Sequence, residues 1–231
     1  MRHAIVLVAV LVAGCAVPGA VERPPRLLTA VGEGRVRVEP DLAVVRVGAE
    51  ARAARLADAT TDVSTRIGAV LARLKAMGIE ERRMRTVQYS IDPVFAAPRA
   101  GEEAARIAGY RVLNVVQVEV PDVRGVGPLV DAAVAAGANT VPSLTFTLAQ
   151  PERAEAEARA RAIAAADAKA RQMASAAGVE LGELVALGEG TLRPVERAAQ
   201  RSMAVATPGP GPVEPGQLEV VVTVEARYRI R

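Results

Sequence analysis

The chain ends in Gln217-Leu218-Glu219-Val220-Val221-Val222-Thr223-Val224-Glu225-Ala226-Arg227-Tyr228-Arg229-Ile230-Arg231. Side chains of a β-strand point alternately to its two faces, so this stretch predicts a strand with one buried face. A strand this regular needs a partner, and we expect it to join the main sheet. The side chains expected on the buried face are Val220, Val222, Val224, Ala226, Tyr228 and Ile230.

The preceding sequence contains further strand patterns. Leu28 to Ala51 alternates in the same way on both sides of a turn signal, Glu39-Pro40-Asp41, and predicts a half-buried antiparallel hairpin. Further strands are predicted at Thr86–Phe95, Ile107–Val120, Ser143–Leu148 and Leu184–Leu187.

Three segments between these strands are predicted to be helices: Ala53–Met77, Val126–Ala136 and Pro151–Ala177. In the first, apolar residues recur at steps of three and four, which places them on one helical face. A glycine follows each segment, as is common where a helix ends. The fold class predicted for residues 28–231 is therefore α+β, a single domain with a mostly antiparallel sheet and about three helices.

Residues 193–216 differ from the rest of this domain because they are rich in proline, glycine and alanine, and include Pro208-Gly209-Pro210-Gly211-Pro212. Such a composition disfavours a helix or a central strand, so we expect a flexible excursion before the last strand. The charged segment Pro98 to Arg106 is expected to be a second mobile loop.

Cys15 is the only cysteine, and it follows a short basic start, an apolar run at 4–12 and small residues. This order resembles a bacterial lipoprotein signal, which implies acylation of the Cys15 thiol and cleavage after Gly14. Residues 1–14 would then be the signal peptide, and residues 15–27 the lipidated N-terminus and its tether. Two alternatives remain open: an ordinary secretory signal with a chance cysteine, or a short membrane anchor.

The lipoprotein interpretation restricts the chemistry of the mature chain. The only histidine, His3, would leave with the signal, and the Cys15 thiol would be blocked. Serine or cysteine catalysis with a histidine base and histidine-ligated zinc are then excluded, and we expect no catalytic residue, cofactor or metal site. Acid–base chemistry by carboxylates alone remains conceivable, but the spacing of Glu102, Glu103, Asp122 and Asp131 favours solvated surface positions.

Nucleic acid is not an expected partner. The formal net charge is only +3, basic and acidic residues are interleaved, and aromatic residues make up 2% of the chain. A surface that stacks bases needs a basic groove with aromatic side chains, which this composition does not favour.

One glycine motif and two asparagines could be taken for functional residues, but for each of them a structural role is expected. Gly32-Glu33-Gly34 lacks the third glycine and the following helix of a phosphate loop, so a bulge or a close backbone approach in an edge strand is expected. Asn114, among apolar residues, is expected to be buried and hydrogen-bonded. Asn139 follows a predicted helix, where asparagine tolerates left-handed backbone.

Taken in order, several short motifs resemble the SIMPL-domain family of bacterial envelope proteins, over about Leu28 to Ile230. The motifs are Gly32-Glu33-Gly34, Pro40-Asp41, Gly78-Ile79, Gly109-Tyr110 with Asn114, Asp131 before Gly137-Ala138-Asn139, Ala158-Arg159, Ala168-Lys169-Ala170, Gly178-Val179, Leu181-Gly182 and Pro215-Gly216. The resemblance implies a secreted, periplasmic or outer-membrane protein without an agreed activity, in a family whose members include immunogenic, stress-linked and oligomeric proteins.

From this resemblance we expect a non-enzymatic envelope lipoprotein that associates with itself as a homo-oligomer and contributes to envelope or oxidative-stress protection. Its membrane contact would be the lipid on Cys15, and Ala16 favours the outer membrane because no aspartate follows the cysteine. The alternative is a monomeric periplasmic binding module whose variable surface is formed by residues 92–106 and 193–216.

Overall fold

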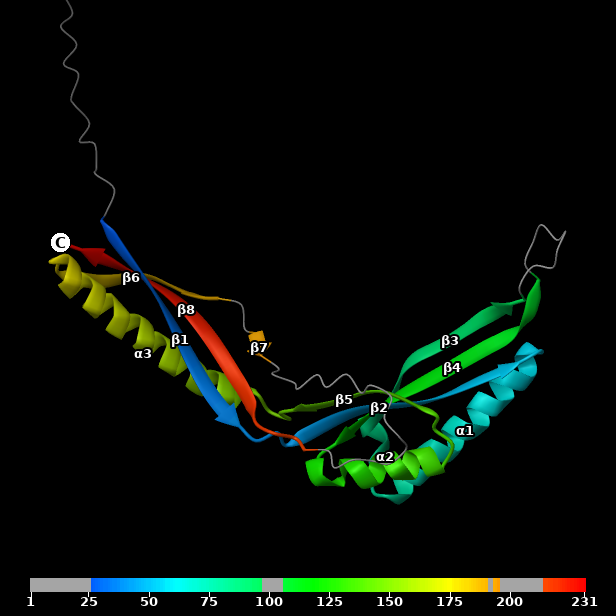
Figure 1. Cartoon of the computed structure of the whole chain (residues 1–231). Coiled ribbons are helices and arrows are strands. Elements are labelled where there is room, and N and C mark those ends of the chain that lie inside the picture. Colours follow the sequence, from blue (N-terminus) through cyan, green and yellow to red (C-terminus); the bar gives the residue numbers. More distant parts are fainter. Residues whose placement is uncertain (1–25, 97–105, 191–192, 196–213) are drawn as a thin grey trace, which may run out of the picture.

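The computed structural model describes residues 26–96, 106–190, 193–195 and 214–231. In these ranges the chain forms eight strands and three α-helices, arranged as two lobes that lie end to end (Figure 1). The elements are β1 (Leu27–Val38), β2 (Leu42–Ala53), α1 (Leu56–Ala76), β3 (Met84–Phe95), β4 (Ile107–Val120), α2 (Val126–Ala135), β5 (Thr140–Thr147), α3 (Glu152–Ala177), β6 (Leu181–Glu189), β7 (Arg193–Val195) and β8 (Leu218–Ile230).

The first lobe, called here the α1–α2 lobe, contains an antiparallel sheet in the order β3-β4-β2-β5 with both helices on one face. Its core combines the inward side chains of β2 and β4 with an apolar stripe of α1. That stripe recurs every three or four residues, so burial of one helical face explains why this segment is a helix. The stripe consists of Ala59, Val63, Ile67, Val70 and Leu74.

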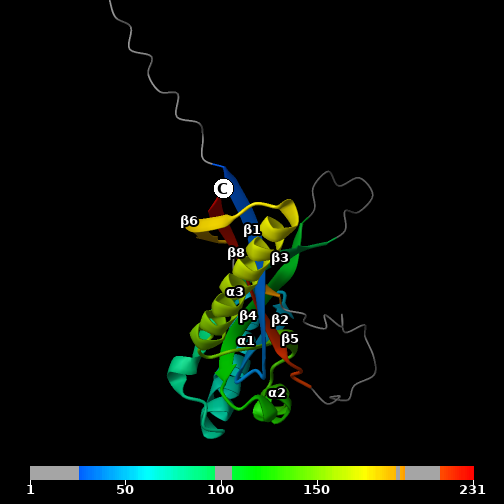
Figure 2. The same ribbon diagram turned by 90° about the vertical axis from the view of Figure 1, so that its left-hand side faces the viewer.

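The second lobe, called here the α3 lobe, contains an antiparallel sheet in the order β1-β8-β6, with the short β7 also paired to β8. A single helix, α3, packs along β1 and β8 on one face of this sheet, as Figure 2 shows from the side of this lobe. Its buried face is made only of alanines at four-residue intervals. They are Ala154, Ala158, Ala162, Ala166, Ala170 and Ala174.

The alanine face of α3 lies very close to the backbone of β1. A Cβ added to Gly34 would come within 2.5 Å of the Ala162 backbone nitrogen, and one added to Gly32 within 2.8 Å of the Ala166 Cβ. Neither glycine has a positive φ, so the reason for glycine here is space, not backbone conformation. The predicted close backbone approach at Gly32-Glu33-Gly34 is therefore confirmed.

Two predictions about strand partners are wrong. β1 and β2 do not form a hairpin, because β1 pairs with β8 in one lobe while β2 pairs with β4 and β5 in the other. The last strand likewise joins β1, β6 and β7, and not the sheet built around β2 and β4. The turn at Glu39-Pro40-Asp41 is instead the passage between the two lobes.

Other expectations hold at the level of single elements. The α+β class, the mostly antiparallel sheets and the three helices are confirmed. Gly78, Gly137 and Gly178 follow the helices with positive φ values of 88°, 119° and 65°. Arg193–Val195, at the start of the expected excursion, forms a short strand beside β8; residues 196–213 and the loop at 97–105 lie outside the described ranges.

Candidate functional site

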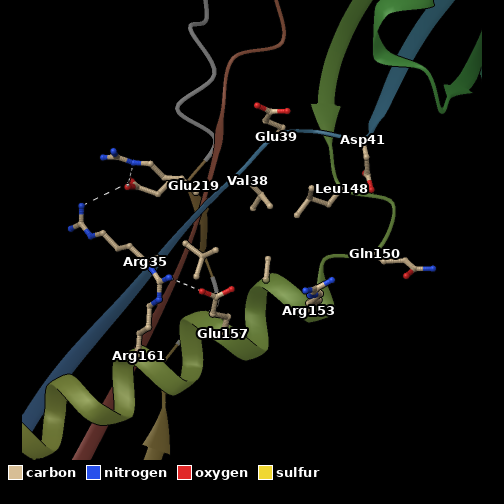
Figure 3. A pocket seen from close by; sticks show the side chains of 13 residues that line it. Arg35, Val38, Glu39, Asp41, Leu148, Gln150, Arg153, Glu157, Arg161 and Glu219 are labelled. Carbon is tan, nitrogen blue, oxygen red and sulfur yellow. Dashed lines mark hydrogen bonds and ion pairs between the residues drawn. The ribbon is translucent and has the colours of Figure 1, made fainter.

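An open groove of about 870 Å³ lies where the two lobes meet. Figure 3 shows its walls: the end of β1, the passage at Glu39 and Asp41, the segment from Leu148 to Gln150, and the first turns of α3. Asp41 fixes this corner, because its Oδ1 accepts a hydrogen bond of 2.7 Å from the backbone N–H of Ala149. The groove therefore forms where the chain crosses twice between the lobes.

Arginine–carboxylate pairs line this groove over an apolar floor. Glu219 lies 3.6 Å from Arg37 and 4.0 Å from Arg35. Arg161 donates a hydrogen bond of 2.6 Å to Glu157 and another of 2.6 Å to the carbonyl oxygen of Arg35. The floor is formed by Val36, Val38, Leu148 and Ala154.

The charges in the described residues are arranged for pairing rather than for proton transfer. Hydrogen bonds from arginine lower the pKa values of four carboxyl groups below their ordinary range. A general acid at neutral pH needs the opposite shift. These carboxyl groups are Asp62, Glu80, Asp167 and Glu189, with Arg66, Arg82, Arg171 and Arg159 as their partners.

A smaller hollow of about 360 Å³ lies between α3 and β6. At its edge the Asp167 carboxylate accepts hydrogen bonds from Arg171 Nε at 2.8 Å and from the Tyr228 hydroxyl at 3.4 Å. Burial of Tyr228 raises the pKa of its phenol, and the neighbouring Asp167 charge raises it further. This tyrosine is therefore a neutral, hydrogen-bonding part of the α3 lobe.

Two strands of the described structure carry clusters of exposed apolar side chains. On β3, Val87, Tyr89, Ile91 and Phe95 are all exposed, with Tyr89 at 52% and Phe95 at 56% of their full accessibility. On β6, Leu184, Val185 and Leu187 are exposed at 47–49%. Both strands lie at the edge of their sheet. Clusters of exposed apolar residues on a soluble surface are typical of contact sites.

The residues singled out from sequence are dispersed. Cys15, with the signal and the tether up to residue 25, lies outside the described residues, as do Glu102 and Glu103. Asp122 accepts a hydrogen bond from the Arg124 backbone, and Asp131 is exposed on α2. No group of three His, Cys, Asp or Glu side chains suited to a metal occurs in the part of the chain that the structure describes.

The two asparagines have structural surroundings, but not those expected. Asn139 does not have a left-handed backbone; its side chain instead joins α2 to β2 through hydrogen bonds of 2.8 Å to both the N–H and the carbonyl of Glu50. Asn114 lies on β4 between Ala49 and Tyr89, and its Oδ1 is buried without a hydrogen-bond partner. Within the described residues, the Oδ1 of Asn114 therefore does not make the expected hydrogen bond.

Sequence reasoning missed the exposed strips on β3 and β6. Alternation indicates that a strand has two faces, but not whether a helix reaches far enough to cover the apolar one. A partial signal was present in β6, where Leu184-Val185-Ala186-Leu187 is apolar without alternation.

Within the described residues, no helix is both long enough and apolar enough to cross a membrane.

Comparison with known proteins gives a family match and three similar proteins. The family described as SIMPL, protein of unknown function (DUF541), matches residues 28–228. The 26 kDa periplasmic immunogenic proteins of Brucella melitensis and Brucella abortus are each 30% identical over 214 residues, covering 90% of this chain and 86% of theirs. The uncharacterized protein YggE of Edwardsiella ictaluri is 28% identical over 172 residues, covering 74% of this chain and 66% of its own.

Proposed function

Because this chain belongs to the SIMPL family, whose function is unknown, we propose that it is a periplasm-facing lipoprotein of the bacterial cell envelope with a structural role. In this proposal Cys15 carries the lipid, most simply in the outer membrane, and the folded lobes associate with other copies of the chain. The periplasmic names of the two Brucella relatives support the location. None of the three relatives carries the name of an enzyme.

The observation that carries the self-association is the pair of uncovered apolar strands. Tyr89, Ile91 and Phe95 on β3, and Leu184 and Leu187 on β6, each remain more than 40% exposed. Aromatic residues make up only 2% of the chain, so placing two of them on an open edge is a notable use of a scarce residue type. Burying such side chains against another copy removes apolar surface from water and favours assembly.

A role in envelope or oxidative-stress protection belongs to the proposal as the biological purpose of the assembly. It is supported by the resemblance to the family alone. We expect a strain that lacks the protein to survive peroxide less well, and the wild-type gene to restore survival. Equal survival of the two strains would remove this part of the proposal without affecting the assembly.

The proposal is tested by chemical cross-linking of intact cells that produce the full chain, followed by fractionation. We expect Cys15-dependent recovery in the membrane fraction and a ladder of cross-linked multiples of the subunit. A Cys15→Ser variant is the matched control, because it should lose the membrane fraction and keep the ladder. If only single subunits are recovered under conditions that cross-link known oligomers in the same cells, self-association is contradicted.

The second candidate function is a monomeric periplasmic binding module. The groove at the meeting of the lobes favours it, because its apolar floor and its rim of paired arginines and carboxylates suit an amphipathic ligand with polar groups. Residues 97–105 and 196–213, expected in its variable surface, lie outside the described ranges. Cross-links to other proteins only, and never between copies, would favour this candidate.

A further inference from the structure

Each sheet has one face that packs on helices and one face that no described helix covers (Figure 1). In the α1–α2 lobe, the side chains of Val45 and Val47 on β2, and of Val116 and Val118 on β4, face the helices and belong to the core. The residues that alternate with them point to the opposite side of the sheet. We call that side the open face of the lobe.

Most charged side chains on the uncovered faces are paired within the chain. On the sheet of the α3 lobe, each arginine on the uncovered face of β1 and β8 has a carboxylate partner. These pairs are Arg35–Glu33, Arg37–Glu219, Arg227–Glu225 and Arg229–Glu183. The open face of the α1–α2 lobe has two such pairs, Arg52–Glu50 at 3.1 Å and Arg111–Asp92 at 3.2 Å.

Arg46 and Arg85 differ from these arginines, and they lie in one row. Arg46 on β2 is opposite Gln117 on β4, and Gln117 is opposite Arg85 on β3. The carboxylate nearest by register is Glu119, two residues along β4, and it pairs with Arg83 at 3.9 Å. Neither Arg46 nor Arg85 is within ion-pair distance of a carboxylate in the described part of the chain, so this row carries two positive charges that the protein does not neutralise.

The side chain between the two arginines is unusually buried. Gln117 is only 7% exposed, and apart from Tyr228 it is the only polar side chain among the described residues that is buried to this extent. On a face without a helix, its neighbours in the sheet must cover it, and the long aliphatic stems of Arg46 and Arg85 flank it on both sides. Stems that lie over Gln117 bring the two guanidinium groups toward each other.

The spacing of the strands suits one small anion between these groups. Neighbouring strands lie about 4.8 Å apart, so the Cα atoms of Arg46 and Arg85 are separated by about 10 Å, a span that two arginine side chains can bridge from both ends. Two like charges held this close without a carboxylate repel each other, and an anion between them turns that repulsion into attraction.

We propose that the row Arg46–Gln117–Arg85 on the open face of the α1–α2 lobe is a binding site for a phosphate group. A guanidinium group donates two parallel hydrogen bonds to an oxyanion, and the Gln117 amide offers a further N–H donor between the two. One arginine is enough to occupy both oxygens of a carboxylate, whereas a phosphate has oxygens for two arginines at once. The inference goes beyond the proposed function and does not depend on self-association.

The same phosphate chemistry has two sources in a cell envelope: a soluble phosphate compound and the headgroup of an anionic phospholipid. The row lies on an exposed sheet face, so it is accessible to either. The test therefore has one arm for each source, and both use the mature chain with Cys15→Ser.

The first arm is a titration with inorganic phosphate at neutral pH, with sodium chloride keeping the ionic strength constant. Nuclear magnetic resonance follows the side-chain amide of Gln117 and the Nε–H groups of Arg46 and Arg85, which should shift together and saturate. Arg46→Gln and Arg85→Gln should each weaken binding at least about tenfold. Arg52→Gln is the matched control, because it removes one positive charge from the same face at a paired position and should leave the affinity within about twofold of the wild type.

The second arm is co-sedimentation with vesicles of phosphatidylcholine, with and without phosphatidylglycerol. Binding to the phosphatidylglycerol vesicles that Arg46→Gln abolishes and Arg52→Gln preserves supports the site and assigns the phosphate to a lipid. Saturable binding of inorganic phosphate without vesicle binding supports the site and assigns a soluble source.

The inference is overturned if neither phosphate nor vesicles bind, or if sodium chloride alone produces the same shifts. It is equally overturned if Arg52→Gln weakens binding as much as Arg46→Gln, because attraction to the general charge of the face then explains the result. Circular dichroism spectra that match the wild type show that the exposed arginine variants remain folded. None of these outcomes bears on self-association, which the cross-linking of intact cells tests separately.

Discussion

Replacing Gly34 by alanine tests the packing that defines the α3 lobe. The new Cβ would come within 2.5 Å of the Ala162 nitrogen and 2.9 Å of the Ala158 carbonyl carbon, and nearer still to the Ala158 carbonyl oxygen. All of these atoms belong to the helix backbone, so no side-chain rotation can relieve the clash. The helix must instead move away from β1.

The size of the effect follows from that movement. Ordinary contact to a Cβ begins at 3.4 Å, so the helix must retreat by about 1.5 Å to clear the Ala158 carbonyl oxygen, and the alanines on both sides loosen. Overpacking of a well-packed core costs about 1–3 kcal/mol, and a clash with rigid backbone belongs at the upper end, about 3 kcal/mol. With a urea dependence of about 2 kcal/mol per molar, the unfolding midpoint should fall by about 1.5 M.

The assay is urea unfolding of the mature Cys15→Ser chain followed by circular dichroism, with hydrogen exchange to assign the loss to α3 and β1. Gly188→Ala is the matched control, because it is also a strand glycine but has no heavy atom within 4 Å of the added Cβ. Its midpoint should stay within about 0.3 M of the wild type. Equal midpoints for Gly34→Ala and Gly188→Ala would refute the backbone contact between α3 and β1.

Three further predictions concern single side chains. Asn139→Ala should lower the free energy of unfolding by about 1–2 kcal/mol, because both hydrogen bonds to the Glu50 backbone are lost, and urea midpoints should show Asn139→Asp to be milder. The Arg171 hydrogen bond lowers the pKa of Asp167, so its stabilisation is present above the unfolded pKa and disappears as pH falls through the lower folded value. Asp167→Asn should therefore be less stable than the wild type at neutral pH, and the two urea midpoints should converge in strong acid; a constant difference would contradict the ion pair. Mass spectrometry of Cys15→Ser from a lipoprotein-processing bacterium should show no acyl chains, whereas the wild type should carry them; an unmodified wild-type Cys15 would refute the lipid anchor.

Sequence patterns predict those helices and strands in which the spacing of apolar residues follows from the burial of one face. The apolar steps of α1 and the alternation of β8 are direct consequences of one face packing on a core, and the structure buries the expected residues, such as Val63 and Val222. Glycine after a helix likewise has a local cause, since Gly78 and Gly178 have positive φ values.

Strand partners could not be obtained in this way. β1 ends before Glu39-Pro40-Asp41, a sequence typical of a tight turn, yet its partner β8 begins at Leu218, far along the chain. Alternation reveals which side chains share a face and carries no information about the neighbouring strand. The hairpin was favoured only because it is the nearest pairing.

The exposure of the apolar side chains on β6 depends on how closely α3 packs against β1, which the sequence of β6 does not show. Gly32 and Gly34 predicted a close approach, but their partners are alanines on α3 more than a hundred residues later. The same close packing leaves Leu184 and Leu187 uncovered, a property that follows from the position of α3 rather than from the sequence of β6. Such surfaces become visible only once the lobes are assembled.

The most direct test of the central claim is the solution mass of the mature Cys15→Ser chain, measured by light scattering over a range of micromolar concentrations. Self-association through the edges predicts a discrete mass of several subunits that falls to one subunit with Ile91→Lys. A mass of one subunit at every concentration, for the wild type as for the variant, would contradict the claim.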